Sequence, residues 1–290
     1  MPELPEVETT VRDLKKKILG RTIVEVWSDF PKMIKKPESF EQFKKRIKGK
    51  RIEKVWRRGK NILIDLSDNK TLLIHQKLTG HLLLGKWKKE KGKWISETKG
   101  PLSEDPMNKF LHLIFFLDNK EMLALSDLRK FAKVELVEKK EIQKELSSLG
   151  PEPLSKDFTF EKFQEVLRGK KGKIKQVLMN QEVLAGIGNI YSDEILWQAK
   201  IHPLREAKGL KKEELRKIYK AMREILAQAI RLGGESISDF RRPSGEKGGF
   251  DKMRKVYRRQ GERCFRCKTP IKRIKIGGRS AHFCPRCQVL

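Results

Sequence analysis

The sequence predicts an α+β protein of two domains, an antiparallel β-sandwich or barrel followed by a helical domain. Short β-type runs follow one another from Arg21 to Val137, whereas apolar residues recur at helical spacing between residues 160 and 232. Two prolines and a glycine in LGPEPLSKDF, residues 149–158, separate the two patterns. A chain of 290 residues is long enough for each half to bury a core of its own.

The first domain is expected to begin with a helix over residues 5–20. Pro5 suits the first turn, Glu6 favours the positive N-terminal end of the helix, and Gly20 ends it. The stretches LSDNKTLL and FLDNKEML both predict tight hairpin turns, because adjacent Asp and Asn residues tolerate positive φ angles. We therefore predict an antiparallel β-sandwich flanked by helices over residues 1–148. Its strands include TIVEVW, RIEKVW, NILIDL, TLLIH, FLHLIFFL and MLAL.

The second domain is expected over residues 149–290. Its apolar periodicity predicts a series of helices, after which the glycine-rich loop RRPSGEKGGF leads to a cysteine module at 256–290. The expected helices span residues 160–169, 173–181, 189–200 and 211–232.

Basic residues far outnumber acidic ones, with 67 Lys plus Arg against 38 Asp plus Glu and a formal net charge of +29. Such a charge predicts a polyanionic partner, most simply nucleic acid. A membrane surface would also attract it, whereas the ion-pair networks of thermophile proteins need balanced signs. No apolar run approaches the roughly 20 residues of a membrane span, and no signal-peptide stretch precedes the fold. We therefore expect a cytosolic protein with no membrane contact.

All four cysteines fall in the last 27 residues, as Cys264, Cys267, Cys284 and Cys287. Two C-x2-C pairs separated by sixteen residues place four thiolates on two knuckles, which is the pattern of a tetrahedral zinc site. Four protein sulfurs leave no position open for a water, so we predict one structural Zn²⁺. A pair of disulfides is the alternative, which a reducing cytosol disfavours.

The stretch NQEVLAGIGNIYSDE places Gly186 and Gly188 just before a helix that should start near Asn189. Backbone N–H groups at a helix start bind phosphate, and glycine allows a close approach. An ordinary tight turn with Asn189 as the N-cap explains the same residues. The basic run GKKGKIK at 169–175 favours the phosphate interpretation.

The motif WRRGKN sets Lys60 at a turn between two strands, beside Arg57 and Arg58. Clustered cations lower a lysine's pKa and neutralise phosphates. A solvated basic turn is the simpler interpretation of the same residues.

Short motifs run through nearly the whole chain in one order. They are PELPEVET, RRGKN, H-x-x-x-TGHL at 75–82, SDLRKF at 126–131, LGPEPL, GIGNIYSDE, GGESISDF at 233–240 and RSAHFCPRCQ. This series resembles the formamidopyrimidine-DNA glycosylase family, bacterial base-excision enzymes that remove oxidised purines. The resemblance implies a helix-two-turn-helix domain with a zinc finger. It also implies a glycosylase and abasic-site lyase that excises 8-oxoguanine and formamidopyrimidines from double-stranded DNA. We expect a monomer, by default, that acts in the cytoplasm with the nucleoid.

The resemblance also implies catalytic roles. Pro2 becomes the nucleophile once methionine removal exposes its secondary amine. An α-amino group has a pKa of about 8, so a useful fraction is unprotonated at neutral pH. Glu3 matches the acid/base residue, and Glu6 matches a supporting position of the DNA-binding site. Lys60 matches a residue that contacts phosphate and assists proton transfer, and Arg279 a residue at the lesion phosphates.

A damaged base must leave the stack before it can be excised, so the vacated space in the duplex must be filled. By resemblance, Leu78, Arg129 and Phe131 fill it, with Arg129 bonded to the orphaned cytosine. Lys170 and Asn189 match residues that bind the flanking phosphates. Leu78 and Phe131 could instead be ordinary core residues.

Two positions depart from the family pattern. Leu78 stands where relatives often have methionine, which keeps an apolar plug of similar volume. Phe110 stands where relatives place a DNA-contacting histidine, which puts that contact in doubt, and the nearby His112 could be a plain strand residue.

Three other functions remain open. The endonuclease VIII branch of the superfamily prefers oxidised pyrimidines, but its members usually begin PEGPE, and Leu4 argues against it. A non-catalytic damaged-DNA-binding protein would share the fold, with its N-terminus blocked by a retained Met1. A zinc-ribbon transcription factor would explain the charge and the cysteines but neither PELPEVE nor RRGKN.

Overall fold

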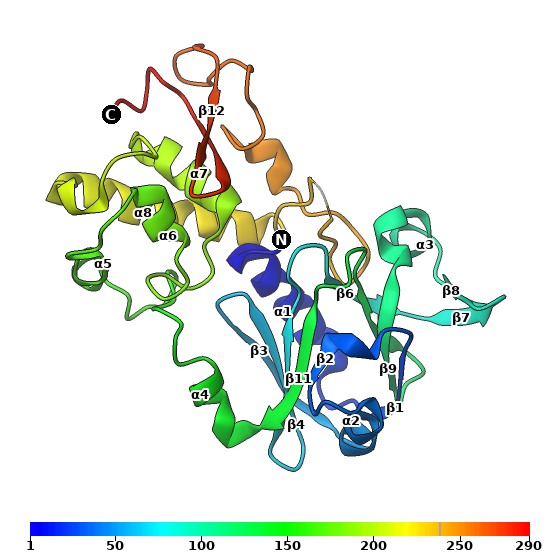
Figure 1. Cartoon of the computed structure of the whole chain (residues 1–290). Helices are drawn as coiled ribbons and strands as arrows, with labels where there is room; N and C mark the ends of the chain where they lie inside the picture. The colour runs from blue at the N-terminus through cyan, green and yellow to red at the C-terminus, as the bar shows by residue number, and fades with distance from the viewer. Residues whose placement is uncertain (238) are drawn as a thin grey trace. The chain divides into compact units, whose positions relative to one another are not determined.

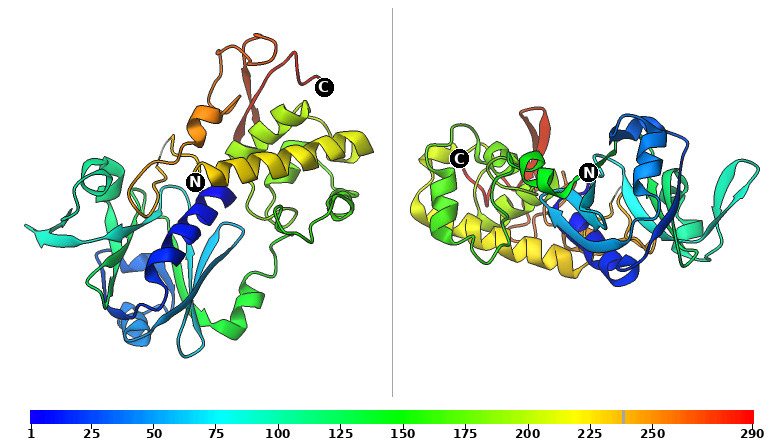
Figure 2. Two further views of the ribbon diagram at one scale, coloured as in Figure 1. Left: turned by 180° about the vertical axis from the view of Figure 1, so that it is seen from behind. Right: turned by 90° about the horizontal axis from the view of Figure 1, so that it is seen from below.

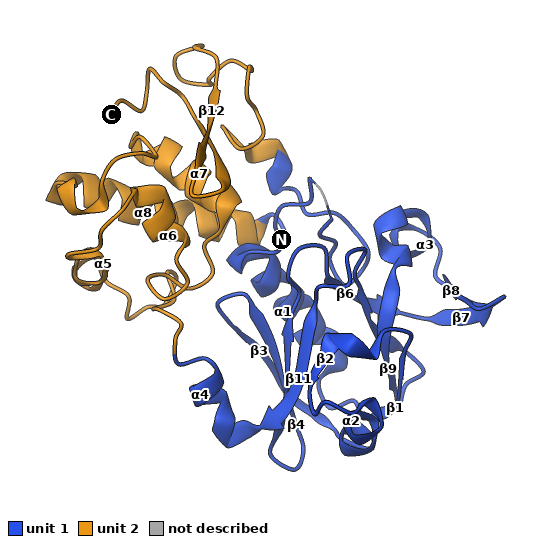
Figure 3. Ribbon diagram, viewed as in Figure 1, with its two compact units in different colours: residues 1–147, 232–251 blue, residues 148–231, 252–290 orange. Residues whose placement is uncertain are grey.

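The computed structural model describes residues 1–237 and 239–290, which divide into two units (Figure 3). Unit 1 comprises Met1–Ser147 and Leu232–Asp251, and unit 2 comprises Ser148–Arg231 and Lys252–Leu290. The segment Leu232–Asp251 thus belongs with the first unit, although the sequence analysis placed it in the C-terminal domain. An ion pair links this segment to α1, since the Arg242 guanidinium donates to both carboxylate oxygens of Asp13 at 2.9 and 3.1 Å.

Two sheets form the centre of unit 1 (Figure 1). The four-stranded sheet has the order β1-β9-β10-β6, and the five-stranded sheet has the order β2-β11-β5-β4-β3. Within these sheets β2 pairs with β11 in parallel, and the remaining neighbours pair antiparallel. The predicted β-sandwich is therefore confirmed. The strands are β1 (Ile23–Ser28), β2 (Ile34–Lys36), β3 (Ile52–Arg58), β4 (Asn61–Leu66), β5 (Lys70–His75), β6 (His81–Gly85), β9 (Leu111–Leu117), β10 (Met122–Ser126) and β11 (Lys133–Glu138).

The expected N-terminal helix is α1 (Leu4–Ile18), with Pro5 in its first turn and three lysines in its last. Acidic residues at the start and basic residues at the end both complement the helix dipole. The predicted apolar stripe is buried and joins one hydrophobic core with side chains from both sheets and from α2 (Phe40–Ile47). The stripe consists of Val7, Val11, Leu14 and Ile18.

The two expected hairpin turns differ in detail. In the first, Asp68 and Asn69 both have positive φ, at 58° and 55°, as the Asp-Asn pair predicts. In the second, positive φ falls on Lys120 at 65°, so that part of the prediction was wrong. There Asn119 acts through its side chain instead, since its Oδ1 accepts from the Glu121 N–H at 3.1 Å.

A hairpin of β7 (Trp87–Glu90) and β8 (Lys93–Ser96) was not anticipated. Both views in Figure 2 show it reaching away from the four-stranded sheet of unit 1. Two short helices, α3 (Pro101–Glu104) and α4 (Ile142–Glu145), complete the α-helices of this unit's described residues.

Unit 2 contains the four expected helices, each of which begins and ends within two residues of its prediction, followed by the cysteine module. The C-terminal strands pair antiparallel, with Ile276 opposite Arg279 at the tip. The elements are α5 (Phe160–Leu167), α6 (Ile174–Met179), α7 (Asn189–Ala199), α8 (Lys212–Arg231), β12 (Lys272–Ile276) and β13 (Arg279–Phe283).

Candidate functional site

The N-terminus of α1 is buried and anchored by one carboxylate. Pro2 is buried, and Glu3 and Glu6 retain 2% and 1% exposure. One carboxylate oxygen of Glu6 accepts a hydrogen bond from the Glu3 N–H at 2.8 Å, and the other accepts from the Glu235 N–H at 2.8 Å. Glu6 therefore fixes the backbone around Pro2 and Glu3.

Glycine is required where the segment 232–251 passes α1. Gly234 has φ of +81°, and a Cβ there would lie 3.0 Å from a carboxylate oxygen of Glu6. A Cβ on Gly248 would lie 2.2 Å from the Gly234 carbonyl oxygen. The GG of the motif GGESISDF thus allows the chain to pack against Glu6. Ser238, within that motif, lies outside the described residues.

Lys60 lies in the turn between β3 and β4, directly after Gly59, which has φ of +56°. It is only 6% exposed, so the solvated turn that sequence alone allowed does not form. His75 stands opposite Asn61 across the β4–β5 pair, immediately beside this turn. Burial, together with the positive charges of Lys77 and Lys60, lowers the pKa of His75 to about 4. His75 is therefore neutral at pH 7.

The residues expected to enter the duplex lie on two turns of unit 1. Leu78 is half-buried on a turn closed by a hydrogen bond from the Gly80 N–H to the Gln76 carbonyl oxygen at 3.1 Å. Arg129 is exposed and lies over the ring of Phe131 at 4.6 Å, and Phe131 is 51% exposed. Phe131 is thus not a core residue, contrary to the simpler interpretation.

In unit 2, the glycine-rich stretch leads into α7 as expected. Gly186 has φ of +95°, and Gly188 is the N-cap residue. The side chain of Gln181 holds this turn, accepting from the Gly186 N–H at 2.9 Å and donating to the Ile187 carbonyl oxygen at 2.8 Å. Asn189 is the first residue of α7, so it is not the N-cap, and its buried Oδ1 has no hydrogen-bond partner.

A cavity of about 410 Å³ opens beside Asn189. Its lining is polar and basic, which suits a phosphate group. Most of these lining residues were not predicted from the sequence, because they come from loops and from alternate positions of a short hairpin. The cavity is lined by Asn189, Tyr257, Arg258, Gln260, Arg273, Ser280 and His282.

A buried ionic network supports this cavity. The ammonium of Lys175, 1% exposed, donates to Asp193 at 2.5 Å and to the Ser192 hydroxyl at 3.0 Å. The second carboxylate oxygen of Asp193 accepts from the backbone N–H of His282 at 2.9 Å, and the His282 Nδ1 lies at the same distance. Lys175 was part of the expected phosphate-binding run, but it serves this network and not the surface.

Glu194 fixes the loop that precedes the cysteines. Its carboxylate accepts hydrogen bonds from the backbone N–H groups of Lys255, Val256 and Tyr257 at 2.8, 3.0 and 2.8 Å. Burial raises the pKa of Glu194, although these hydrogen bonds oppose the rise. Tyr257 is thereby held at the edge of the cavity beside Asn189.

Two expected phosphate ligands lie elsewhere in unit 2. Lys170 is exposed in the turn after α5 and does not line the cavity. Arg279 is exposed at the tip of the β12–β13 hairpin, after Gly277 and Gly278 with φ of +52° and +77°. A Cβ on Gly277 would lie 2.3 Å from the amide nitrogen of Gln176, so glycine also allows the tip to approach α6.

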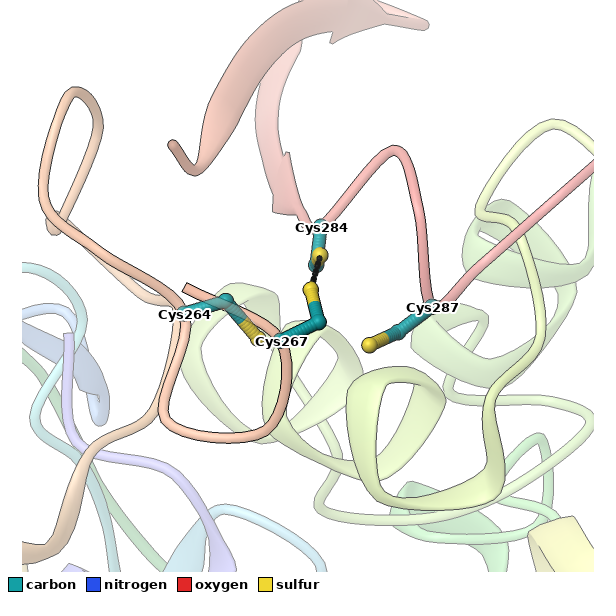
Figure 4. A group of neighbouring side chains, drawn as sticks. All are labelled: Cys264, Cys267, Cys284 and Cys287. Carbon is teal, nitrogen blue, oxygen red and sulfur yellow. Dashed lines mark hydrogen bonds between the residues drawn. The ribbon is translucent and has the colours of Figure 1, made fainter. Parts of the chain in front are cut away.

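The four cysteines converge as predicted (Figure 4). Their sulfur atoms all lie within 4.8 Å of one another, and Sγ of Cys267 and Sγ of Cys284 are 3.4 Å apart. Each knuckle is closed by the backbone, with the Lys268 N–H donating to the Cys264 carbonyl oxygen at 2.9 Å. The geometry fits one tetrahedral metal ion.

The acidity of the thiols also fits a metal ion. Hydrogen bonds from the side chain and backbone of Thr269 lower the pKa of Cys267 to about 6, which favours a thiolate ligand. Burial and the neighbouring sulfurs raise the pKa of Cys287 to about 12. A bound dication would offset that repulsion among thiolates.

The cysteine module packs against α7 through Trp197. The indole joins a buried cluster with Val256, Cys264 and Ile271, and the Arg266 guanidinium lies 3.7 Å from the ring centroid. Metal site and helix therefore form one body within unit 2.

A second cavity of about 440 Å³ lies in unit 1 beside the unanticipated hairpin. Phe110, which replaces the expected DNA-contacting histidine, is part of its lining together with Trp27 and Trp94. His112 also lines it and pairs with Asp29 at 2.8 Å. His112 is thus a strand residue with a local partner.

Across the described residues, no helix combines the length and apolar character needed to cross a bilayer.

Family models match most of the chain. The formamidopyrimidine-DNA glycosylase N-terminal domain matches residues 1–134, and the H2TH domain of the same glycosylase matches residues 149–241. A zinc finger found in FPG and IleRS matches residues 261–289.

Proteins named formamidopyrimidine-DNA glycosylase are similar over their whole length. The chain is 40% identical to that of Streptococcus mutans over 290 residues, covering 99% of each chain. It is 41% identical to that of Carboxydothermus hydrogenoformans over 288 residues, covering 99% of this chain and 100% of the relative.

Solved structures agree. A Lactococcus lactis FPG mutant bound to Fapy-dG-containing DNA has a TM-score of 0.87 and 36% identity, with 100% of both chains covered. MutM in complex with DNA containing carbocyclic 8-oxo-G has a TM-score of 0.86 and 37% identity, again with 100% of both chains covered.

Proposed function

The chain belongs to the formamidopyrimidine-DNA glycosylase family, and from that premise we propose that it excises oxidised purines from duplex DNA and then cuts the abasic strand. Similar proteins were solved with DNA containing Fapy-dG, 8-oxo-G or an abasic site, which supports both steps. The net charge of +29 suits a DNA partner.

The nucleophile we propose is the secondary amine of Pro2, exposed once Met1 is removed. Its lone pair attacks the sugar C1′, and the bond between C1′ and the base breaks with its electron pair leaving on the base. The nitrogen then loses its proton, the C1′–O4′ bond breaks as O4′ takes a proton, and the ring-opened iminium links Pro2 to the DNA. Loss of the proton at C2′ then expels the 3′ phosphate, and water releases the enzyme after elimination.

Glu3 is the proposed acid/base residue. As the residue next to the Pro2 amine, it can deliver a proton to the opening sugar or the departing base and accept one afterwards. Lys60 is proposed to contact the phosphate beside the lesion and to assist these proton transfers. Glu6 is proposed as a positioning residue, because its carboxylate is committed to backbone N–H groups.

The observation that carries this proposal is the burial and anchoring of the N-terminus. Pro2 is buried beside two nearly buried carboxylates, Glu3 and Glu6, and Glu6 binds a segment 229 residues away in addition to capping α1. An amine that attacks a sugar must be held in place and shielded from water.

DNA contacts are proposed for both units separately. In unit 1, Leu78, Arg129 and Phe131 fill the space left by the everted nucleotide, and the exposed Phe131 ring suits insertion between bases. In unit 2, Asn189 and the cavity beside it bind a phosphate, with Lys170 and Arg279 as further phosphate contacts.

We propose Zn²⁺ as the ion held by the four cysteines, because four thiolates in tetrahedral reach are its preferred structural set. The ion would stiffen the module that carries Arg279 and leave no site for chemistry. We further propose a catalytic domain over residues 1–148, against which the segment 232–251 packs, a DNA-binding domain over the rest of residues 149–290, and a monomer acting at the nucleoid.

Base release and strand cutting, measured separately, test the proposal. Duplexes carrying 8-oxoguanine, formamidopyrimidine, an oxidised pyrimidine or no lesion are incubated with enzyme. We expect both oxidised purines to be released and the strand to be cut without added base. Preferred release of the pyrimidine would instead indicate endonuclease VIII specificity, and tight binding without release would indicate a non-catalytic damage-binding protein.

A further inference from the structure

Two turns of unit 1 that lie fifty residues apart in sequence share one hydrogen-bond network. The hydroxyl of Thr79 donates to one carboxylate oxygen of Asp127 in a short hydrogen bond, and it accepts from the Arg129 N–H at 3.0 Å. The Arg129 N–H also lies 3.3 Å from the same oxygen of Asp127. The second oxygen of Asp127 accepts from the Ala132 N–H at 2.7 Å.

This network is shielded from water. Asp127 is fully buried and Thr79 is 6% exposed, whereas Leu128 and Phe131 are 47% and 51% exposed. Hydrogen bonds to a buried carboxylate are strong, and an N–H left without an acceptor there is costly. The backbone of the turn is therefore held rigidly while its apolar side chains are exposed to solvent. Packing of a hydrophobic core does not explain that combination.

We infer that Thr79 and Asp127 are positioning residues that join the two turns into one rigid wedge. The wedge consists of Leu78 on the first turn and Arg129 and Phe131 on the second. This inference rests on the proposed function, in which these three side chains enter the duplex. Because Thr79 follows Leu78 directly and holds the Arg129 N–H, neither turn moves without the other.

Joining the two turns affects the step in which the three side chains enter the duplex and the damaged base leaves it. Side chains that enter a base stack must displace the stacked bases together, since a partly filled gap lets the damaged base return. Preorganising all three removes the entropy of ordering them during insertion. The network therefore acts on eversion of the base and not on the chemistry at Pro2.

Thr79→Val removes the hydroxyl and keeps the side-chain volume. It therefore breaks the hydrogen bonds between the two turns with little change in packing. We expect insertion, followed by stopped-flow fluorescence of 2-aminopurine beside 8-oxoguanine, to slow about tenfold, because small misplacements have large effects on such steps. Excision of 8-oxoguanine should slow by the same factor. Cleavage of a preformed abasic site in single-stranded DNA needs no wedge and should stay within twofold of wild type. Thr79→Ser, which keeps the hydroxyl, should restore insertion.

Thr71→Val is the matched control. The Thr71 hydroxyl donates to the buried carboxylate of Asp65 at 2.9 Å, so this change removes the same kind of bond between β4 and β5. It should lower the melting temperature comparably but leave insertion unchanged. Equal slowing by both variants would make the effect one of general stability and overturn the inference.

A double-mutant cycle decides whether the turns are joined. In a Phe131→Ala background the wedge is already incomplete, so adding Thr79→Val should cost less than twofold more. Additive losses would show that Thr79 acts independently of the wedge, which contradicts the inference. Absence of any 8-oxoguanine excision by the wild-type protein would instead contradict the proposed function itself.

Discussion

Glu6 and Glu235 lie 229 residues apart in the sequence, yet a carboxylate oxygen of Glu6 accepts a hydrogen bond from the Glu235 N–H at 2.8 Å. The other oxygen accepts from the Glu3 N–H at the same distance. One buried side chain therefore sets the position of the N-terminus against a loop that follows α8. The proposed nucleophile depends on this link.

Glu6→Gln should separate positioning from binding. The amide keeps one acceptor but turns an N–H₂ group toward the second backbone donor, which costs about 1–3 kcal/mol of stability. We expect single-turnover excision to fall roughly 10- to 100-fold because the amine loses its position, with duplex affinity nearly unchanged. Glu8→Gln is the control, since Glu8 binds the side chains of Arg12 and Arg57. Wild-type excision by the Glu6 variant would rule out the positioning role.

Lys60→Ala should affect base excision more than strand cutting. Excision of an intact base requires a proton transfer that activates the departing base, whereas a preformed abasic site has no base to activate. We expect 8-oxoguanine excision to fall by about 100-fold, the scale of acid–base assistance, and abasic cleavage by much less. Lys54→Ala removes an exposed lysine from β3, the strand that leads into the turn of Lys60, and should leave both activities intact. Equal losses in both assays with the Lys60 variant would mean a role in binding only.

Stability should fall in acid because of His81, which is buried, and His75, which is half-buried. Burial lowers the pKa of His81 to about 4, and burial with nearby lysines lowers that of His75 to about 4, from an ordinary value of 6.5. The unfolded chain binds protons first, so the stabilisation is complete above pH 6.5 and is lost as pH falls toward 4.

His81→Gln removes one of these titrations. Between pH 7 and 4.5 the free energy of unfolding should fall by roughly 2 kcal/mol less in this variant than in wild type, by proton linkage. Urea unfolding at a series of pH values measures the difference. Parallel pH profiles for the two proteins would mean that His81 titrates normally in the folded state.

Asn189→Ala and Lys170→Ala should weaken binding to damaged and undamaged duplex alike, because phosphate contacts carry no base information. Each lost cationic contact should reduce the slope of log K against log salt by about 1, so Lys170→Ala should flatten it and Asn189→Ala should not. Fluorescence anisotropy at several salt concentrations gives both quantities. A loss confined to damaged duplex would place these residues in base recognition instead.

Two variants of the cysteine module should show that its folding and its part in the chemistry are separable. Cys264→Ser should release the metal ion, loosen the module around Trp197 and abolish specific DNA binding, because metal binding supplies folding free energy here. Arg279→Ala should keep metal and fold but lose affinity for damaged duplex and strand cutting. Metal content, melting and cleavage are measured on both variants. Near-normal cleavage by the Arg279 variant would remove Arg279 from the site.

Sequence alone predicted the elements whose signals are local. Periodicity located α1, α7 and α8, and cysteine spacing predicted the sulfur cluster, because backbone and metal geometry fix those patterns over short distances. The cavity at Asn189 and the link from Glu6 to Glu235 could not be predicted, since both join segments distant in sequence. Lys175 was misassigned because nothing in a basic run distinguishes the one lysine that a buried Asp193 will bind.

Borohydride trapping on an 8-oxoguanine duplex tests the central claim most directly. Reduction converts the iminium into a stable amine, and peptide sequencing of the adduct identifies the linked residue. We expect a covalent complex through the nitrogen of Pro2, formed only when Met1 has been removed and lost when an extra residue precedes Pro2. Trapping at a lysine such as Lys60, or undiminished trapping by protein that retains Met1, would contradict it.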